Sequence, residues 1–334
     1  MRILCRLLIN IQHGCEVMNN NLINANNGNK KNGFFTRLSR DLVKNKGLYV
    51  MLLPVVAYYV IFKYLPIYGI QIAFKDFKPR LGVFGSEWIG LKNFTDFFNS
   101  VYFSRLIRNT LMINVLNLAF GFPAPIILAL LINEVRSTRF KRTVQTLTYL
   151  PHFISTVVVC GMIMQFVSTN GFITQLLTSF GLPQKNLLTK PEFFRTIYIS
   201  SDIWQGVGWG SIIYIAAISG INPSLYEAAK IDGAGRLKQI IHITIPSIMP
   251  TIITLLVLRI GTMMSLGYEK IILLYNPAIY ETADVISSFV YRKGLLDLDY
   301  SFSTAVDFFN SVINLILLVS ANKITKKLTD NGLW

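Results

Sequence analysis

Six apolar stretches, each near the length of a helix that crosses a bilayer, constrain this chain more than any other feature of its sequence. They span residues 48–70, 110–132, 144–167, 196–219, 248–267 and 302–321. A membrane-spanning helix needs about 20 mostly apolar residues. Only 15% of the residues are charged, whereas a soluble domain carries about 25%. The sequence therefore predicts an all-α membrane protein with six transmembrane helices, in which interior prolines such as Pro151 are tolerated.

Lysine and arginine are unevenly distributed between the segments that connect these stretches. The connecting segments lie alternately on the two sides of the membrane. The segments of one side together hold 18 of these residues and those of the other side hold 12. The richer set consists of 1–47, 133–143, 220–247 and the end after Asn322. Because basic residues accumulate in cytoplasmic loops, we expect this set, and with it both termini, to be cytoplasmic. The same rule explains the net charge of +15 without nucleic acid as a partner.

The apolar stretches leave no room for a large soluble domain. We expect a cytoplasmic, largely disordered N-terminal tail at 1–47, a transmembrane domain at 48–322 with a cytoplasmic loop at 220–247, and a cytoplasmic C-terminal tail at 323–334. The N-terminal tail is polar and rich in asparagine, which is typical of disorder. Its apolar start is interrupted by polar residues, unlike a signal peptide.

No motif for covalent chemistry or nucleotide binding appears in the sequence. There is no Gly-Lys-Ser/Thr, so a phosphate-binding loop is missing. Neither His-Glu-x-x-His nor Gly-x-Ser-x-Gly occurs. The three cysteines (Cys5, Cys15 and Cys160) have neither the number nor the spacing of a disulfide framework or a metal site. We expect no enzymatic activity, no metal and no cofactor in this chain, and any ATP would bind to another chain.

Three of the apolar stretches carry polar or small residues at i, i+3 and i+7, which places them on one helix face. The sets are Asn114, Asn117 and Gly121; Asp202, Gln205 and Trp209; and Asp307, Asn310 and Asn314. Such faces are expected to look into a helix bundle and not at lipid. Two interpretations stay open, because the polar residues can join helices to one another or line a path for a substrate.

Arg259 lies about 11 residues into the fifth stretch, roughly 16 Å along a helix axis. At that depth its guanidinium needs water or a carboxylate, such as Asp202 or Asp307. The residues predicted for a substrate path are therefore Asp202, Gln205, Trp209, Arg259, Asp307 and Asn310. His152 and His242 are interpreted as structural.

The cytoplasmic loop between the fourth and fifth stretches is predicted to contain a short helix. Asn222 is a favourable N-cap, Pro223 suits the first helical turn, and Gly233 suits a left-handed C-terminal position. Two adjacent alanines, Ala228 and Ala229, would permit close approach of another protein. A second amphipathic stretch then leads to Pro246. Locally, this pattern fits a docking element or a plain surface connector.

The same segment carries a longer signature: Glu-Ala-Ala, three residues, glycine, nine residues, then Ile-x-Leu-Pro. Here it is present as Glu227-Ala228-Ala229, Gly233 and Ile243-Thr244-Ile245-Pro246, with Ile245 in place of leucine. This resembles the signature loop of binding-protein-dependent ABC importer permeases. Shorter segments at 88–94, 149–155, 275–285 and 332–334 resemble the branch that imports polysaccharides and complex oligosaccharides.

The resemblance implies a type I ABC importer permease fold in a bacterial plasma membrane. It implies a second, homologous permease subunit, two cytoplasmic ATPase subunits that bind ATP and Mg, an extracytoplasmic sugar-binding protein, and a sugar or oligosaccharide substrate. The loop helix would couple the permease to the ATPase. The residues implied in coupling are Glu227, Ala228, Ala229, Asp232, Gly233 and Pro246.

Two other functions compete with this interpretation. A secondary transporter driven by an ion gradient would show paired half-repeats with broken helices at matching positions, and no such symmetry is visible. A membrane enzyme, such as a lipid or glycan transferase, would need a convergent catalytic set that the sequence lacks. Transport stimulated by ATP together with a binding protein would separate the three.

Overall fold

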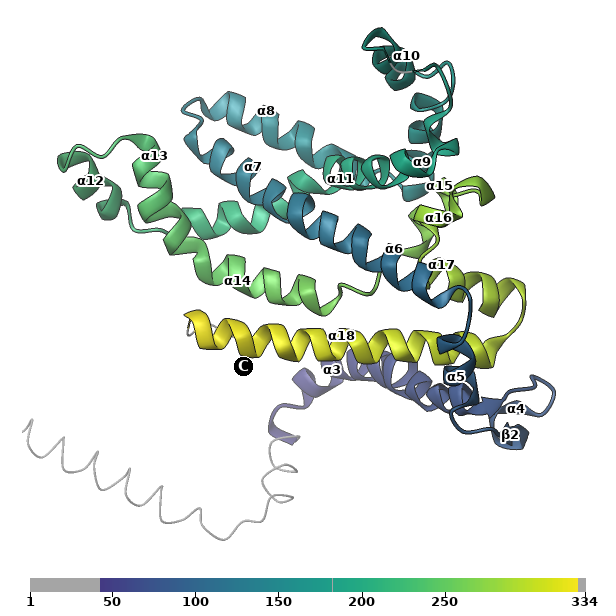
Figure 1. Cartoon of the computed structure of the whole chain (residues 1–334). Helices are drawn as coiled ribbons and strands as arrows, with labels where there is room; N and C mark the ends of the chain where they lie inside the picture. Colours follow the sequence, from purple (N-terminus) through teal and green to yellow (C-terminus); the bar gives the residue numbers. More distant parts are fainter. Residues whose placement is uncertain (1–42, 182, 330–334) are drawn as a thin grey trace, which may run out of the picture. The chain divides into compact units, whose positions relative to one another are not determined.

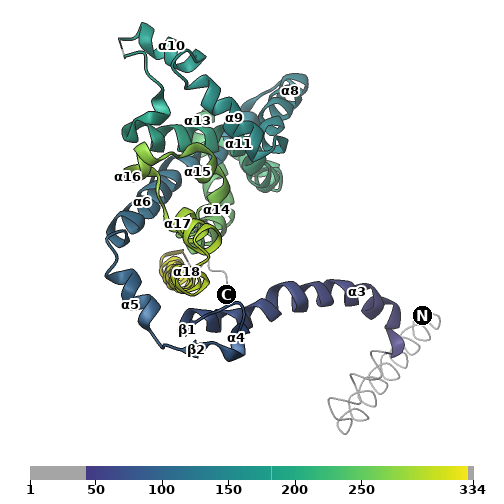
Figure 2. The same ribbon diagram turned by 90° about the vertical axis from the view of Figure 1, so that its right-hand side faces the viewer.

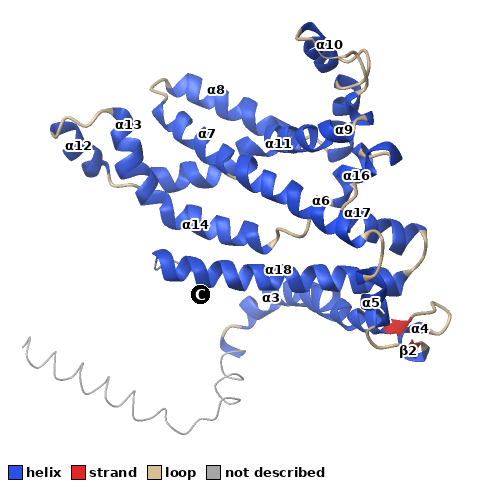
Figure 3. Cartoon of the chain, in the orientation of Figure 1, coloured by secondary structure: helices blue, strands red, loops and turns tan. Residues whose placement is uncertain are grey.

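The computed structural model describes residues 43–181 and 183–329, which are helical almost throughout (Figures 1 and 3). The chain forms two compact units, residues 1–69 and residues 70–334. Most of the tail predicted to be disordered, including Cys5 and Cys15, lies outside the described residues, as does the C-terminal motif at 332–334.

Within the described part of the first unit, one helix accounts for almost all residues. Helix α3 (Lys46–Tyr59) continues as a π-helical segment, Val60–Tyr64, and a 3-10 segment, Leu65–Phe74, which enters the second unit. No side chain of α3 is buried, and an 18-residue window within the run Lys46–Phe74 has a mean hydropathy of 1.8. A helix that is apolar on all sides is suited to lipid or to other apolar helices, as expected for the stretch 48–70.

The second unit is built mainly from seven longer helices. They are α6 (Phe103–Leu116), α7 (Pro123–Glu134), α8 (Thr138–Tyr149), α9 (Thr156–Phe166), α11 (Pro191–Ser219), α14 (Ile245–Gly261) and α18 (Tyr300–Thr329). A π-helical segment, Asn117–Gly121, joins α6 to α7 in one continuous run.

Shorter elements connect these helices. The short helices are α4 (Gly82–Gly85), α5 (Lys92–Phe98), α10 (Phe172–Ser179), α12 (Pro223–Ile231), α13 (Arg236–Gln239), α15 (Tyr268–Leu274), α16 (Tyr280–Ala283) and α17 (Ile286–Tyr291). Two strands, β1 (Lys75–Asp76) and β2 (Glu87–Trp88), form a small antiparallel hairpin that pairs Lys75 with Trp88. The all-α prediction missed this hairpin.

Two helix pairings organise the second unit. Helix α11 packs against both α7 and α8, and α14 packs against α18. Figure 2 shows α18 nearly end-on with α14 beside it. The largest apolar cluster joins α9 and α11 to the segment that contains α15 and α16, around residues such as Cys160, Phe194 and Ile271. The buried thiol of Cys160 therefore has the packing role of a small apolar side chain.

The predicted stretches all coincide with helices, although not every one is a single apolar span. In the described chain, four helical runs are long and apolar enough to cross a membrane: Lys46–Phe74, Phe103–Glu134, Arg236–Gly261 and Tyr300–Lys327. A fifth candidate is the bent pair Thr138–Phe153 and Thr156–Phe166. Helix α11 is 29 residues long but does not belong to this group, because polar residues interrupt its apolar sequence.

The stretch predicted as a span at 144–167 is broken, and the expectation of one continuous helix there was wrong. The chain bends by 99° between α8 and α9, after a 3-10 turn at Leu150–Phe153 in which Pro151 occupies the second position. Ile154 is extended, and the Ser155 hydroxyl accepts a hydrogen bond from the Val158 N–H, which starts a new helix. Proline supplies no N–H to continue the first helix, and serine favours the beginning of the next.

The predicted end of the fifth stretch at 267 was also wrong, because α14 ends at Gly261. The chain beyond it is held by Asn314 of α18. The side-chain oxygen of Asn314 accepts a hydrogen bond from the Met264 N–H at 2.8 Å, and its amide donates to Ser265 Oγ at 2.8 Å. Asn314 thus joins helices by satisfying the backbone where α14 stops, which is one of the two roles left open for the polar faces.

We expect Gly208→Ala to destabilise the protein by about 1–3 kcal/mol, as overpacking does. A Cβ at Gly208 would collide with the backbone carbonyl of Thr148, so α11 could no longer approach α8. Gly206→Ala is the matched control, because a Cβ at Gly206 meets nothing within 4 Å. Thermal unfolding of the purified variants measures the difference, and equal midpoints would show that this approach does not depend on Gly208.

Candidate functional site

The loop helix α12 is defined at both ends by its own sequence. The Ser224 N–H donates to the Asn222 side-chain oxygen at 3.0 Å, and Pro223 begins the helix. At the other end Gly233 has a φ of +74°, and the Ala234 N–H donates to the Ala229 carbonyl at 2.8 Å. This is a helix C-terminus closed by a left-handed glycine, as the sequence predicted.

Three contacts brace the loop that carries this helix, and one of them comes from α12 itself. The Tyr226 hydroxyl lies 2.9 Å from Thr244 Oγ1, in the π-helical segment that leads into α14. Gln239 donates to the Ala234 carbonyl at 2.7 Å. Arg236 pairs with Glu134, the last residue of α7, at 3.7 Å. The loop therefore contacts the segment before α14 through Tyr226 and the end of α7 through Arg236.

The outer surface of α12 is open. None of its side chains is buried, and Ile231 and Leu225 are 87% and 48% exposed. Glu227, Ala228 and Asp232 are exposed as well, whereas Ala229 is partly covered. Figure 1 shows α12 projecting from one end of the second unit together with α13. Exposed apolar side chains beside exposed acids form a surface suited to a protein partner.

Pro246 does not belong to this surface, because it lies in the first turn of α14. His242 is exposed and its ring Nδ1 lies 3.0 Å from the Lys238 carbonyl.

A second feature is an open cavity of about 280 Å³ between helices of the second unit, lined by a few polar residues and by many small or apolar ones. Asp202 and Arg259 both line it, together with Asn117. The structure therefore brings together two of the residues predicted for a substrate path. Its remaining walls come from small or apolar residues: Gly121, Phe122, Pro125, Ile203, Gly206, Val207, Gly210, Ile213, Tyr214 and Leu255.

The carboxylate of Asp202 is held by partners other than the predicted Arg259. Asn117 donates to Asp202 Oδ2 at 2.8 Å, and the Lys270 ammonium lies 3.5 Å from Asp202 Oδ1. Lys270 belongs to α15, is 7% exposed and lies 5.0 Å above the Tyr198 ring. Burial lowers the pKa of Lys270, and the Asp202 carboxylate opposes that shift. The sequence analysis did not select Lys270, because it lies in a connection outside the apolar stretches.

Gln205 and Trp209 face the bend between α8 and α9. Gln205 donates to the Ile154 carbonyl at 3.2 Å. The Trp209 ring is stacked on His152, with centroids 4.6 Å apart and 5° between the planes, and it remains 48% exposed. Gln205 therefore joins α11 to the bend after α8, whereas part of the Trp209 ring stays exposed and open to a ligand.

The other polar faces divide in a similar way. Asn114 donates to the Thr110 carbonyl of its own helix at 2.8 Å. On α18, Asp307 is exposed, whereas Asn310 is 4% exposed and its side-chain oxygen is without a hydrogen-bond partner in the described structure.

A third cluster surrounds Asp284, whose side chain is fully buried. Its carboxylate accepts hydrogen bonds from Arg105 and Arg292, each at 2.9 Å, and from Ser288 at 3.1 Å. Asn109 donates to the Asp284 carbonyl at 2.9 Å. The cluster fastens the connection between α14 and α18 to α6. In the sequence, Asp284 was considered only as part of a family motif. Its complete burial, which marks it as a structural residue, could not be seen there.

Residues 121–328, from the π-helical segment before α7 to the end of α18, match the model of a protein family described as the binding-protein-dependent transport system inner membrane component. The chain belongs to this family. Membership confirms that it is a membrane-embedded transport permease of an ABC system and not an enzyme, as the loop signature predicted. It decides against both the ion-gradient-driven transporter and the membrane transferase.

Two relatives from Bacillus subtilis (strain 168) align with the permease over most of its length. It is 46% identical over 299 residues to the polygalacturonan/rhamnogalacturonan transport system permease protein YteP, which covers 89% of this chain and 93% of the relative. It is 46% identical over 294 residues to the protein LplB, covering 88% and 92%.

A solved structure is similar as well. It is a chain from the crystal structure of a bacterial alginate ABC transporter in complex with an alginate pentasaccharide-bound periplasmic protein. The TM-score is 0.81 at 46% identity, covering 89% of this chain and 100% of that one. The permease therefore has the fold of an ABC importer subunit.

We expect Asp284→Asn to lower the free energy of unfolding of the permease by about 3–5 kcal/mol, because it leaves two partly buried guanidiniums without their fully buried carboxylate. Asp297→Asn provides the control. Asp297 pairs with Lys293 at 2.8 Å, but both side chains are more than one-third exposed, so its loss should cost about 0–1 kcal/mol. Thermal unfolding compares the two, and equal losses would contradict a special role for the buried cluster.

Proposed function

We propose that the permease forms half of the translocation pathway of an ATP-driven importer of oligosaccharides. The observation that supports this proposal is helix α12, which is exposed at the protein surface and contains the Glu-Ala-Ala part of the family signature. The relatives support the substrate class, since one is named for polygalacturonan and rhamnogalacturonan transport and the similar structure holds an alginate pentasaccharide on its periplasmic protein.

In this proposal a second, homologous permease completes the pathway, and two cytoplasmic ATPase subunits bind ATP and Mg below it. An extracytoplasmic sugar-binding protein delivers the substrate. Glu227, Ala228, Ala229, Asp232 and Gly233 form or close the docking helix, and Pro246 starts the helix that receives its movement. The carboxylates offer acceptors for basic or amide groups of the ATPase.

The geometry gives coupling a physical route. Residues Arg236–Gly261 form one helical run. A movement of α12 and α13 would therefore move α14 with them. Helix α14 packs against α18 and α11, and the Arg236–Glu134 pair carries the movement to α7. Closure of the ATPase subunits would thereby reopen the bundle outward, and hydrolysis would return it to an inward-facing state.

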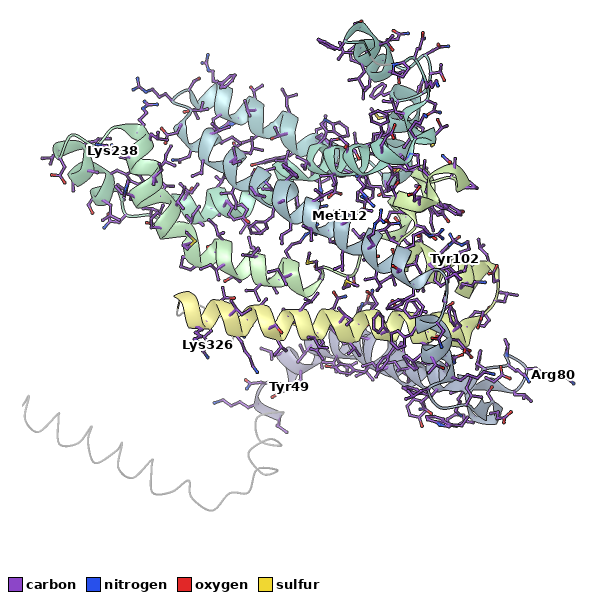
Figure 4. The ribbon with its side chains drawn as sticks, in the orientation of Figure 1. Tyr49, Arg80, Tyr102, Met112, Lys238 and Lys326 are labelled. Carbon is purple, nitrogen blue, oxygen red and sulfur yellow. The ribbon has the colours of Figure 1, made fainter. Side chains whose placement is uncertain are left out.

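We propose six spans with both termini in the cytoplasm. The bent α8–α9 pair supplies the third span and α11 supplies the fourth, and their polar residues are tolerated because they face the bundle. Figure 4 shows Lys238 and Lys326 at one end of the second unit, and Arg80 and Tyr102 at the other. Arg136, Arg139, Lys141 and Arg142 lie at or after the α7–α8 turn, at the end that also carries Lys238.

Reporter fusions test this topology. After Lys327, a reporter that is active only in the cytoplasm should give a signal. Near Lys185, a reporter that is active only outside the cytoplasm should give a signal. The reason is the accumulation of basic residues on the cytoplasmic side. The reverse pattern would place α12 outside the cell and would remove the docking assignment.

Variants of the docking helix test the coupling. Gly233→Val forces a β-branched side chain into a left-handed conformation at φ +74°, and Glu227→Lys reverses an exposed charge. We expect normal expression and normal pairing with the second permease. The amount of ATPase that co-purifies, or the stimulation of ATP hydrolysis by the binding protein, should fall about tenfold or more. The reason is that loss of a central contact in a protein interface costs about 2 kcal/mol or more.

Gly235→Val is the matched control. Gly235 also has open space around a Cβ, but its φ of −66° is accessible to valine. Co-purification of the ATPase and its stimulated hydrolysis in reconstituted membranes are the measurements. If Gly233→Val and Glu227→Lys both behave like Gly235→Val, α12 is only a connector.

A further inference from the structure

The charged groups in and next to the cavity beside α11, namely Asp202, Arg259 and Lys270, sum to one positive charge. Asp202 contributes one negative charge and Arg259 one positive charge to its walls. Asp202 is already compensated by Lys270 at 3.5 Å and by the Asn117 amide at 2.8 Å. The tyrosines nearby, Tyr198 and Tyr214, are buried and add no charge.

Arg259 is the group without a partner in this arrangement. Within residues 43–181 and 183–329, the structure shows no hydrogen bond or ion pair of its side chain with another residue. Its helix is one of the apolar runs suited to crossing a membrane, where a guanidinium is retained only if it meets water or an anion. Since Lys270 and Asn117 occupy the Asp202 carboxylate, the exposed guanidinium of Arg259 is open to an anion from outside this chain.

The walls of the cavity leave room for such a ligand. Gly206 and Gly210 lie on the α11 side, and a Cβ at Gly206 would meet nothing within 4 Å. The volume of about 280 Å³ accommodates part of a sugar chain and not a whole one. A guanidinium binds a carboxylate through two parallel hydrogen bonds, which combines charge with orientation.

We propose that Arg259 is a specificity-determining residue that binds the carboxylate of a uronic acid unit as an acidic oligosaccharide passes through this cavity. The proposal rests on the proposed function and names its substrate class. Lys270 keeps Arg259 available by neutralising Asp202, and the small residues of α11 admit the sugar ring.

The charge of the cavity is measured first, in the assembled transporter with both permeases and the ATPase. Gly206→Cys places a thiol in the open space, and the parent chain measures the background from Cys5, Cys15 and the buried Cys160. An anionic thiosulfonate should modify this thiol faster than a cationic one of the same size. Adding Arg259→Gln should lower that rate ratio by roughly tenfold, and Asp202→Asn should raise it.

The ligand is tested next by protection of the same thiol. A galacturonate trimer should slow the modification, and the same trimer with its carboxyls methyl-esterified should not. Arg259→Gln should abolish protection, whereas Arg259→Lys, which keeps the charge but loses the paired hydrogen bonds, should retain the rate ratio and weaken protection.

Other outcomes would overturn the proposal. A thiol that neither reagent reaches would show that the second permease covers this face. Equal protection by the acid and the ester, protection by neither, or protection that survives Arg259→Gln would each remove Arg259 as the carboxylate-binding group.

Transport separates this proposal from the one on which it rests. If the reconstituted importer shows no ATP-dependent, binding-protein-dependent uptake of any oligosaccharide, the proposed function fails. If uptake occurs and Arg259→Gln leaves the rate for an acidic oligosaccharide unchanged, only the role of Arg259 fails.

Discussion

Inside a bilayer each backbone N–H and C=O must find its partner within the protein, and this requirement controls where the permease can depart from a helix. The sharpest departure follows α8, where Gln205 donates to the Ile154 carbonyl and the Ser155 hydroxyl accepts the Val158 N–H in the first turn of α9. The second follows α14, where Asn314 of α18 accepts the Met264 N–H. Each break is possible because a polar side chain of the same bundle satisfies the exposed backbone.

The same environment makes every buried charge consequential. Asp284 is fully buried and is held by two guanidiniums, so the connection after α14 is fastened to α6 by a compensated ion cluster. Asp202 is compensated by Lys270, which belongs to that connection as well. The connection between α14 and α18 therefore contributes neutralising charges at two places, and Arg259 is left facing the cavity. The uncompensated charge of Arg259 is the basis for the proposal that the substrate carries a carboxylate.

The ends of the loop helix α12 were predictable because the residues that specify them lie within a few positions of each end. Asn222, Pro223 and Gly233 specify the two ends of α12 through backbone preferences that act within a few residues, and the structure shows those ends where the sequence placed them. The polar faces were only partly predictable. Spacing placed Asp202, Gln205 and Trp209 on one side of a helix, but it could not tell which neighbouring element each would meet.

The sequence by itself determined that this chain is a helical membrane permease of the ABC importer family, because apolar length and the loop signature are properties of contiguous residues. It did not determine that 144–167 would bend by 99°, since proline is tolerated in many helices and the break also needed Gln205 from α11. Nor did it determine the partner of Asp202. Lys270 is 68 positions further along the chain, and only the packing of α15 against the bundle brings its ammonium to that carboxylate. Such a contact follows from how the helices fold together, and no local pattern of residues specifies it.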